Sequence, residues 1–122
     1  MSDLVEFLRE RLDEDDEAAL DMHARDWTLT GRDIMTAGFV IAEASSDFTA
    51  HHIARHDPAR VLREVAAKRA ILAGHSTVTG WNWPDQSDGS VQMDYVEALR
   101  RTLRHLAAVY SDHPDYDEAW RP

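Results

Sequence analysis

Apolar positions recur every four residues at the start of the chain. Leu4, Leu8 and Leu12 share this spacing, which places the three side chains on one side of an α-helix. The pattern predicts a helix over residues 3–23. Five consecutive acidic residues, 13–17, interrupt the apolar stripe, and we expect them to form a solvated stretch of the same helix.

The pattern changes to short alternation over residues 26–44. Polar and apolar residues alternate around Trp27 and Leu29, with β-branched and aromatic side chains, and a turn signal follows at Gly31-Arg32-Asp33. This predicts a small antiparallel hairpin or three-stranded meander. Because so small a sheet is marginal in water, a helix must cover one face. The residues that we expect on the covered face are Trp27, Leu29, Phe39 and Ile41.

A capped break separates two predicted helices in the middle of the chain. A cap signal at residues 45–47 opens a helix that runs to about His56. Asp57-Pro58 ends it, because proline disfavours helical geometry at the preceding residue and suits the first position after an N-cap. We therefore expect the Asp57 carboxylate to cap the second helix by accepting a backbone N–H, from Ala59 or Arg60, in its first turn.

The second half of the chain continues the helical pattern. We expect the second helix to stop at Gly74 and the turn-rich residues 75–89 to form a loop. A last long helix follows over residues 90–110. The tail predicts a turn and a short helix with Pro114 at its start, in which Tyr116 and Trp120 share one face and dock the C-terminus onto the core. The apolar stripe of the last long helix consists of Val96, Leu99, Leu103, Leu106 and Tyr110.

These elements predict an α+β fold. It is a helix-rich single domain over residues 1–122, with about four helices plus a short C-terminal one and a small antiparallel β hairpin or meander near residues 26–44. An apolar share of 43% suffices for one ordinary core at this length.

Composition narrows the class of protein. The chain has no cysteine, which excludes disulfides and thiolate metal sites. Its acidic start lacks the basic region and apolar core of a signal peptide, and no apolar run approaches the roughly 20 residues of a membrane span. We therefore expect a cytoplasmic protein that does not bind membranes.

Negative charge dominates the two ends of the chain. The formal net charge is −10, of which −7 falls in residues 1–33, +1 in residues 34–84 and −4 in residues 85–122. An acidic surface repels phosphate backbones, so direct nucleic-acid binding is not expected. Solubility is the simpler explanation of the charge; an acidic mimic that fills the basic groove of a nucleic-acid-binding partner is the alternative.

Three stretches resemble a known family. The run His52-Ile53-Ala54-Arg55-His56-Asp57-Pro58-Ala59-Arg60-Val61-Leu62-Arg63-Glu64-Val65 is similar to the core motif of a small uncharacterised family, a domain of unknown function from actinobacteria and their phages. Near the C-terminus, residues 106–107, 110–116 and 120–122 also resemble that family, as do residues 3–8 and 12–15 at the start of the chain. The resemblance implies a shared fold and origin. It implies no activity, cofactor or catalytic residue.

A histidine pair is the main candidate for chemistry. His52 and His56, four residues apart on one helix, can face one ion, and Asp57 can add an oxygen. This would make the protein a metal-dependent hydrolase. The candidates for a further ligand are His113, Asp112, His105 and His75. The alternative is that both histidines are partly buried and hydrogen-bonded, with Asp57 spent on the cap.

No other catalytic pattern stands out. The chain has no nucleophile elbow and no glycine-rich phosphate loop, so the sequence predicts neither a catalytic residue nor a cofactor.

We prefer a non-catalytic accessory or regulatory protein that acts by binding another protein. The residues that we expect at the contact are Trp81, Trp83, Arg60 and Arg63. Arg60 and Arg63 belong to a basic strip with Arg55, Lys68 and Arg69. This strip can pair with the acidic first helix of its own chain or of a second copy, which would give a homodimer. The two tryptophans can instead lie over the core as a lid.

Overall fold

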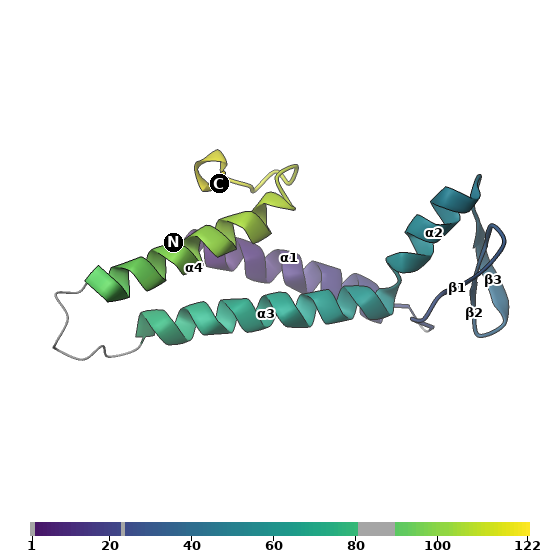
Figure 1. Ribbon diagram of the computed structural model, residues 1–122, viewed down its shortest axis with the longest axis horizontal. Helices are drawn as coiled ribbons and strands as arrows, with labels where there is room; N and C mark the ends of the chain where they lie inside the picture. The colour runs from purple at the N-terminus through teal and green to yellow at the C-terminus, as the bar shows by residue number, and fades with distance from the viewer. Residues whose placement is uncertain (1, 23, 81–89) are drawn as a thin grey trace. The chain divides into compact units, whose positions relative to one another are not determined.

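The computed structural model describes residues 2–22, 24–80 and 90–122, and the predicted α+β class is confirmed there (Figure 1). The described residues form four α-helices, a three-stranded sheet and a short 3-10 helix. In chain order these are α1 (Ser2–Leu20), β1 (Thr28–Thr30), β2 (Asp33–Thr36), β3 (Phe39–Glu43), α2 (Asp47–Arg55), α3 (Pro58–Gly80), α4 (Ser90–Ala108) and the 3-10 helix η1 (Glu118–Trp120).

The chain divides into two compact units. We call Met1–Leu12 together with Ala67–Pro122 the helical unit, and Asp13–Ala66 the sheet unit. The expectation of one domain over residues 1–122 stays a prediction.

The core of the helical unit is aliphatic. The predicted stripe of the first helix is confirmed, because Leu4, Leu8 and Leu12 are fully buried. α3 adds the buried Leu72 and α4 adds the buried Leu103. Removing such side chains from water is the main force that stabilises this unit.

Aromatic rings hold the C-terminal tail in the helical unit. The ring centroid of Phe7 on α1 lies 6.0 Å from that of Tyr116 and 5.1 Å from that of Trp120. This confirms the predicted docking of Tyr116 and Trp120. The short helix differs from the expectation: it begins at Glu118 instead of Pro114, because Asp117 caps it by accepting the N–H of Ala119.

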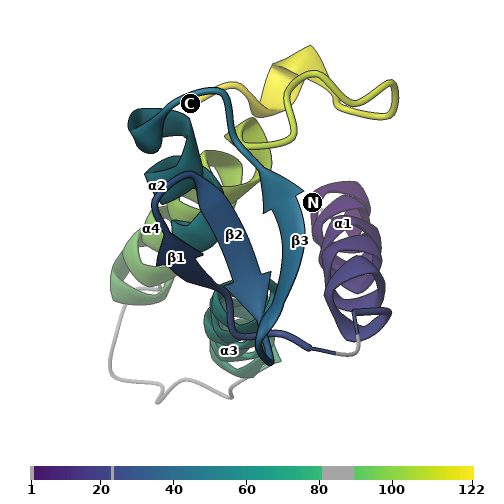
Figure 2. The same ribbon diagram turned by 90° about the vertical axis from the view of Figure 1, so that its right-hand side faces the viewer.

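The sheet unit is a meander with one helix on it. The strand order is β1-β2-β3, both pairings are antiparallel, and α2 packs on β1 and β2 (Figure 2). Ser46 caps α2 by accepting the N–H of Thr49, as the cap signal predicted. Its small core is closed by Ile34, Ala44 and Ala50, with Trp27, Leu29 and Ile53 packed against them.

The prediction of the covered face of the sheet is correct for two of the four residues and wrong for the other two. Trp27 and Leu29 pack on the core of the sheet unit, but Phe39 and Ile41 are exposed. The reason is that α2 packs on the first two strands, so that every residue of β3 remains exposed to solvent.

The expected end of the second helix is also wrong. α3 continues through Gly74 to Gly80, so residues 75–80 are helical where a loop was expected. The buried face of α3 continues past Gly74, since His75 lies one turn beyond Leu72 and is also buried. An internal glycine costs a helix only roughly 1 kcal/mol. Residues 81–89 lie outside the described part of the chain.

Among the described residues, no helix combines the length and the apolar character needed to cross a bilayer.

Candidate functional site

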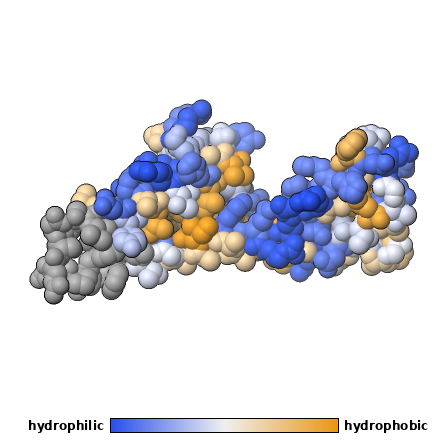
Figure 3. Space-filling model, in the orientation of Figure 1, coloured by the Kyte–Doolittle hydropathy of each residue, from blue (hydrophilic) through white to orange (hydrophobic). Residues whose placement is uncertain are grey.

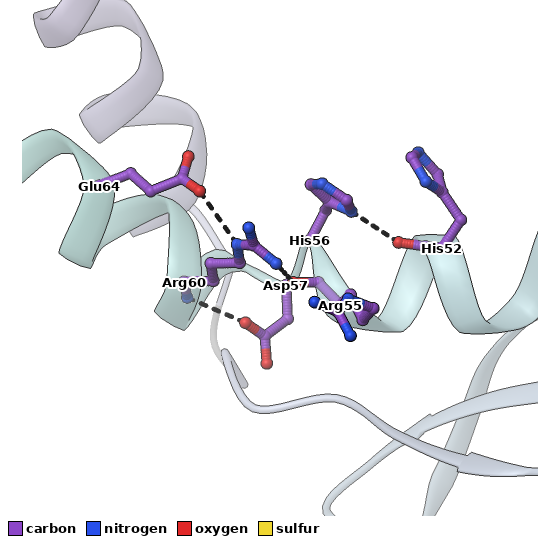
Figure 4. A network of polar contacts seen from close by, with 6 residues as sticks. All are labelled: His52, Arg55, His56, Asp57, Arg60 and Glu64. Atoms are coloured by element: carbon purple, nitrogen blue, oxygen red, sulfur yellow. Dashed lines mark hydrogen bonds and ion pairs between the residues drawn. The ribbon is translucent and has the colours of Figure 1, made fainter.

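Asp57 lies at the break between α2 and α3 and uses both carboxylate oxygens. Oδ1 accepts the backbone N–H of Arg60 at 2.9 Å, which confirms the predicted N-cap (Figure 4). Oδ2 accepts the backbone N–H of Trp27 at 3.1 Å. One side chain therefore caps α3 and ties the segment before β1 to the same point.

A second hydrogen bond strengthens this tie. The backbone N–H of Ala59 donates to the carbonyl of Arg25 at 3.1 Å. We call the contacts of Asp57 and Ala59 with residues 25–27 the Asp57 clamp. Sequence reasoning found the cap but missed the clamp, because nothing in the local pattern brings together positions 30 residues apart.

His52 and His56 lie together, as their spacing predicted. Their ring centroids are 4.5 Å apart, and Nδ1 of His56 lies 2.7 Å from the carbonyl oxygen of His52. Because a carbonyl oxygen only accepts, Nδ1 of His56 carries a proton and donates it to this hydrogen bond. Both histidines are exposed, so the expectation that they are partly buried is wrong.

The predicted third ligand does not join this pair. The Asp57 carboxylate points away from the two rings in Figure 4, toward the Arg60 amide. Within residues 2–22, 24–80 and 90–122, no group of three or more histidine or acidic side chains is placed to hold a metal ion.

The other proposed ligands lie in the helical unit and have structural surroundings of their own. Nδ1 of His113 accepts from Nη1 of Arg11 at 2.9 Å and from the backbone N–H of Asp115 at 3.0 Å. His75 is buried, whereas His105 and Asp112 are exposed.

His75 is the one residue of the described chain whose pKa clearly shifts. Burial lowers the pKa of its imidazole below the ordinary value of 6.5, and the guanidinium of Arg100 lowers it further. Both effects disfavour the charged ring. The neutral form of His75 is thus favoured inside the helical unit, where the side chain is part of the packing.

The predicted partner-binding residues have different surroundings. Nε of Arg60 donates to Glu64 at 3.0 Å, and its Nη1 donates to the Arg55 carbonyl at 3.3 Å (Figure 4). The Arg60 side chain therefore already makes hydrogen bonds within its own chain at the start of α3. Arg63 is exposed. Trp81 and Trp83 lie outside the described residues.

Four large apolar side chains of β3 and of the start of α2 are exposed in the sheet unit, as are Leu20 and Met22 elsewhere in it. The exposed fraction is 73% for Phe39, 55% for Val40, 41% for Ile41 and 88% for Phe48. We call these four residues the β3 surface. Orange side chains reach the surface in the region of α2 and the sheet in Figure 3. The alternating pattern signalled strands but did not reveal which strand lies outside the helix cover.

Comparison with known proteins places the chain. All of it, residues 1–122, matches DUF6221, a family of unknown function. The chain belongs to DUF6221. No curated protein and no solved structure matches this DUF6221 chain.

Proposed function

We propose that this DUF6221 protein acts without catalysis, by binding a protein partner through the β3 surface. The observation that supports this is the exposure of Phe39, Val40, Ile41 and Phe48. Exposed apolar residues that gather on a small protein are typical of interaction sites. Burying such aromatic and aliphatic side chains against a partner would supply the binding energy.

The geometry favours an extended segment as the partner. β3 pairs with β2 on one side, and along its other edge no strand of the described residues lies beside it. Such an edge offers backbone N–H and C=O groups to an added strand, and side chains at alternate positions set the specificity.

Charge favours a basic partner. The sheet unit holds twelve acidic and five basic residues, a net charge of −7 with neutral histidines. An apolar segment flanked by lysine or arginine is therefore attracted, whereas a second copy of the chain would bring two units of −7 together. We propose the basic segment as the occupant of the edge.

The test is a binding measurement with a matched control. Partners are captured from a host lysate, identified, and titrated as recombinant proteins against the chain and against Phe39→Thr/Val40→Thr, which keeps β propensity. We expect the variant to bind at least about tenfold more weakly, because it loses two anchors of the contact.

Met93→Gln is the control, since Met93 is as exposed as Phe39 but lies in the helical unit. Equal affinity of the β3 variant and the control would refute the proposal. Light scattering adds the other outcome: a dimer that the β3 variant dissociates would make a second copy the occupant.

The sequence-based candidates remain arms of the same test. Trp81→Ala and Trp83→Ala ask whether the tryptophan loop contributes, and Arg60→Gln and Arg63→Gln ask the same of the basic strip. A cytoplasmic location, and the origin in actinobacteria and their phages to which the motif points, belong to this proposal as well.

A metal-dependent hydrolase that uses His52 and His56 stays a prediction. What supports it is the 4.5 Å separation of the rings, and what speaks against it is the use of Asp57 in the clamp. Calorimetric titration with zinc or manganese, compared with His52→Ala, tests it directly.

A further inference from the structure

A cavity of about 290 Å³, open to solvent, lies in the sheet unit, where the end of α1 and the start of α3 both contribute to its wall. Its apolar lining comes from Ala19 and Met22 on the α1 side and from Pro58 and Val61 on the α3 side. Trp27 adds an aromatic ring to the lining. The volume is at the small end of ligand pockets in proteins, which suits a molecule of fragment size.

The Asp57 clamp holds part of this wall in place. It fixes the backbone of Trp27 to the first turn of α3, in which Pro58 lies. His56, which also lines the cavity, is held by its hydrogen bond to the His52 carbonyl. The wall is therefore formed before any ligand arrives, which lowers the entropic cost of binding.

Two polar side chains on the lining define what fits. They are Asp15 and His56, and Nδ1 of His56 is already used in the hydrogen bond to the His52 carbonyl. Trp27 contributes its aromatic ring to the lining, and its indole N–H is itself buried.

Charge decides the class of ligand. The sheet unit carries −7, Asp15 is the charged residue on the lining, and the face of an indole ring attracts cations. We propose that this cavity binds a small organic cation, an ammonium group on a compact apolar body. The site gives the His56-Asp57-Pro58 stretch a second use: His56 and Pro58 line the cavity, and Asp57 fixes its wall.

The proposal is independent of the β3 surface and has a test of its own. Binding of 2-phenylethylammonium, 2-phenylethanol and phenylacetate to the full chain is measured by calorimetry and by ligand-observed NMR. We expect the cation to bind at least about tenfold more tightly than the carboxylate, with the alcohol between them. Equal binding of the cation and the carboxylate would overturn the ligand class.

Two variants locate the binding. Ala18 is exposed and lies on the lining, so Ala18→Phe fills the cavity with little risk to the fold and should abolish binding of the cation. Asp15→Asn should weaken it about tenfold, whereas Asp13→Asn makes the same charge change on an exposed residue of α1 and should alter it less than twofold.

Each outcome of these binding measurements either supports or overturns the site. Unchanged binding in Ala18→Phe would overturn the site, as would no binding to the folded wild-type chain at about 10 mM ligand. Circular dichroism of each variant confirms that it is folded. An equal loss in Asp15→Asn and Asp13→Asn would show a general charge effect and overturn the assignment to this cavity.

Discussion

At the scale of the residue, the Asp57 carboxylate joins two segments of the sheet unit, α3 and the stretch before β1. Its two oxygens cap α3 and hold the backbone of Trp27, at 2.9 and 3.1 Å. A carboxylate that accepts two backbone N–H groups at a half-buried position links helix formation to tertiary structure. Loss of this side chain therefore affects the cap and the clamp together.

Asp57→Ala should lower the free energy of unfolding by about 2–3 kcal/mol, because it removes an N-cap and leaves the Trp27 N–H without its acceptor. Asp57→Asn, which can still accept one hydrogen bond, should cost about half as much. Urea denaturation followed by circular dichroism measures both. Asp26→Ala, at a neighbouring exposed position, should change stability by less than about 0.5 kcal/mol. A loss in Asp57→Ala no larger than this control would contradict the clamp.

His75 makes stability depend on pH. The folded chain keeps it neutral through burial and through Arg100, whereas the unfolded chain protonates it at the ordinary pKa of 6.5. The unfolded state then binds more protons, so the His75 contribution is complete above pH 6.5 and is lost as the pH falls from there to the lowered pKa of the folded state.

His75→Gln should therefore flatten the decrease of the melting temperature between about pH 7.5 and pH 5.5. His105→Gln, at an exposed position of α4, should leave the slope as it is in the wild type. Thermal melts of the three proteins at several pH values give the comparison. Parallel slopes for all three would show that His75 titrates normally.

Sequence patterns predicted the contacts that join residues close together in the chain. The proline after Asp57 predicted the cap correctly, because capping involves residues three apart. The burial state of His52 and His56 was not predictable, since a four-residue spacing gives a common face but does not say whether that face meets solvent.

At the scale of the element, the C-terminal tail depends on one ring. Phe7 on α1 makes aromatic contacts with Tyr110, Tyr116 and Trp120, and Nη1 of Arg11, one turn on, donates to His113. A segment of tail without long regular structure is thereby held to a helix at the other end of the chain.

Phe7→Ala should lower the free energy of unfolding by about 3–4 kcal/mol and release the tail, since it empties a buried aromatic site. Phe48→Ala makes the same change at an exposed position and should cost less than about 0.5 kcal/mol. Urea denaturation gives the stability, and limited proteolysis near residue 114 reports the release of the tail. Similar losses in both variants would contradict the aromatic anchoring.

In the β2–β3 turn, Ala37 has a backbone conformation that is unfavourable for alanine. Ala37 has φ 50° and Gly38 has φ 83°, as in the two-residue turns that favour right-twisted hairpins. Alanine pays a steric cost in this left-handed region that glycine and asparagine largely escape.

Ala37→Gly should therefore stabilise the chain by about 0.5–1 kcal/mol, and Gly38→Ala should destabilise it by about 1 kcal/mol. Chemical denaturation of the two variants measures both signs. Ala42→Gly, in β3 itself, should destabilise because the strand backbone gains freedom in the unfolded state. Destabilisation by Ala37→Gly would show that the turn does not need a left-handed residue there.

Element types were predictable and their extents were not. Periodicity predicted the helices and left a hairpin or a three-stranded meander open, and the structure has the meander. The end of α3 was not predicted, because Gly74 is a local stop signal and the buried face of the helix nevertheless continues to His75. The exposure of β3 escaped because it depends on where α2 lies.

At the scale of the whole molecule, net charge sets the terms of association. The chain carries −10, and −7 of this belongs to the sheet unit. A partner that lays a basic segment along β3 would be drawn by this field over about a Debye length, roughly 10 Å at 0.1 M salt. The apolar contacts of the β3 surface are insensitive to salt.

The association rate of the proposed partner should therefore fall as salt increases, while the dissociation rate changes little. Stopped-flow or surface-based kinetics between about 50 and 500 mM sodium chloride measures both rates. Asp47→Asn near the end of β3 should reduce the salt dependence, and Asp117→Asn in the helical unit should leave it unchanged. An association rate that does not respond to salt would argue for an uncharged partner.

The open edge of β3 makes the protein prone to aggregate. Unpaired strands with apolar side chains are templates for amyloid-like stacking, and mutual repulsion between highly charged molecules keeps them apart. That repulsion vanishes near the isoelectric point, which is about pH 5.0. Colloidal stability of the protein therefore rests on its carboxylates, and mildly acidic storage would remove the safeguard that lets an uncovered strand persist.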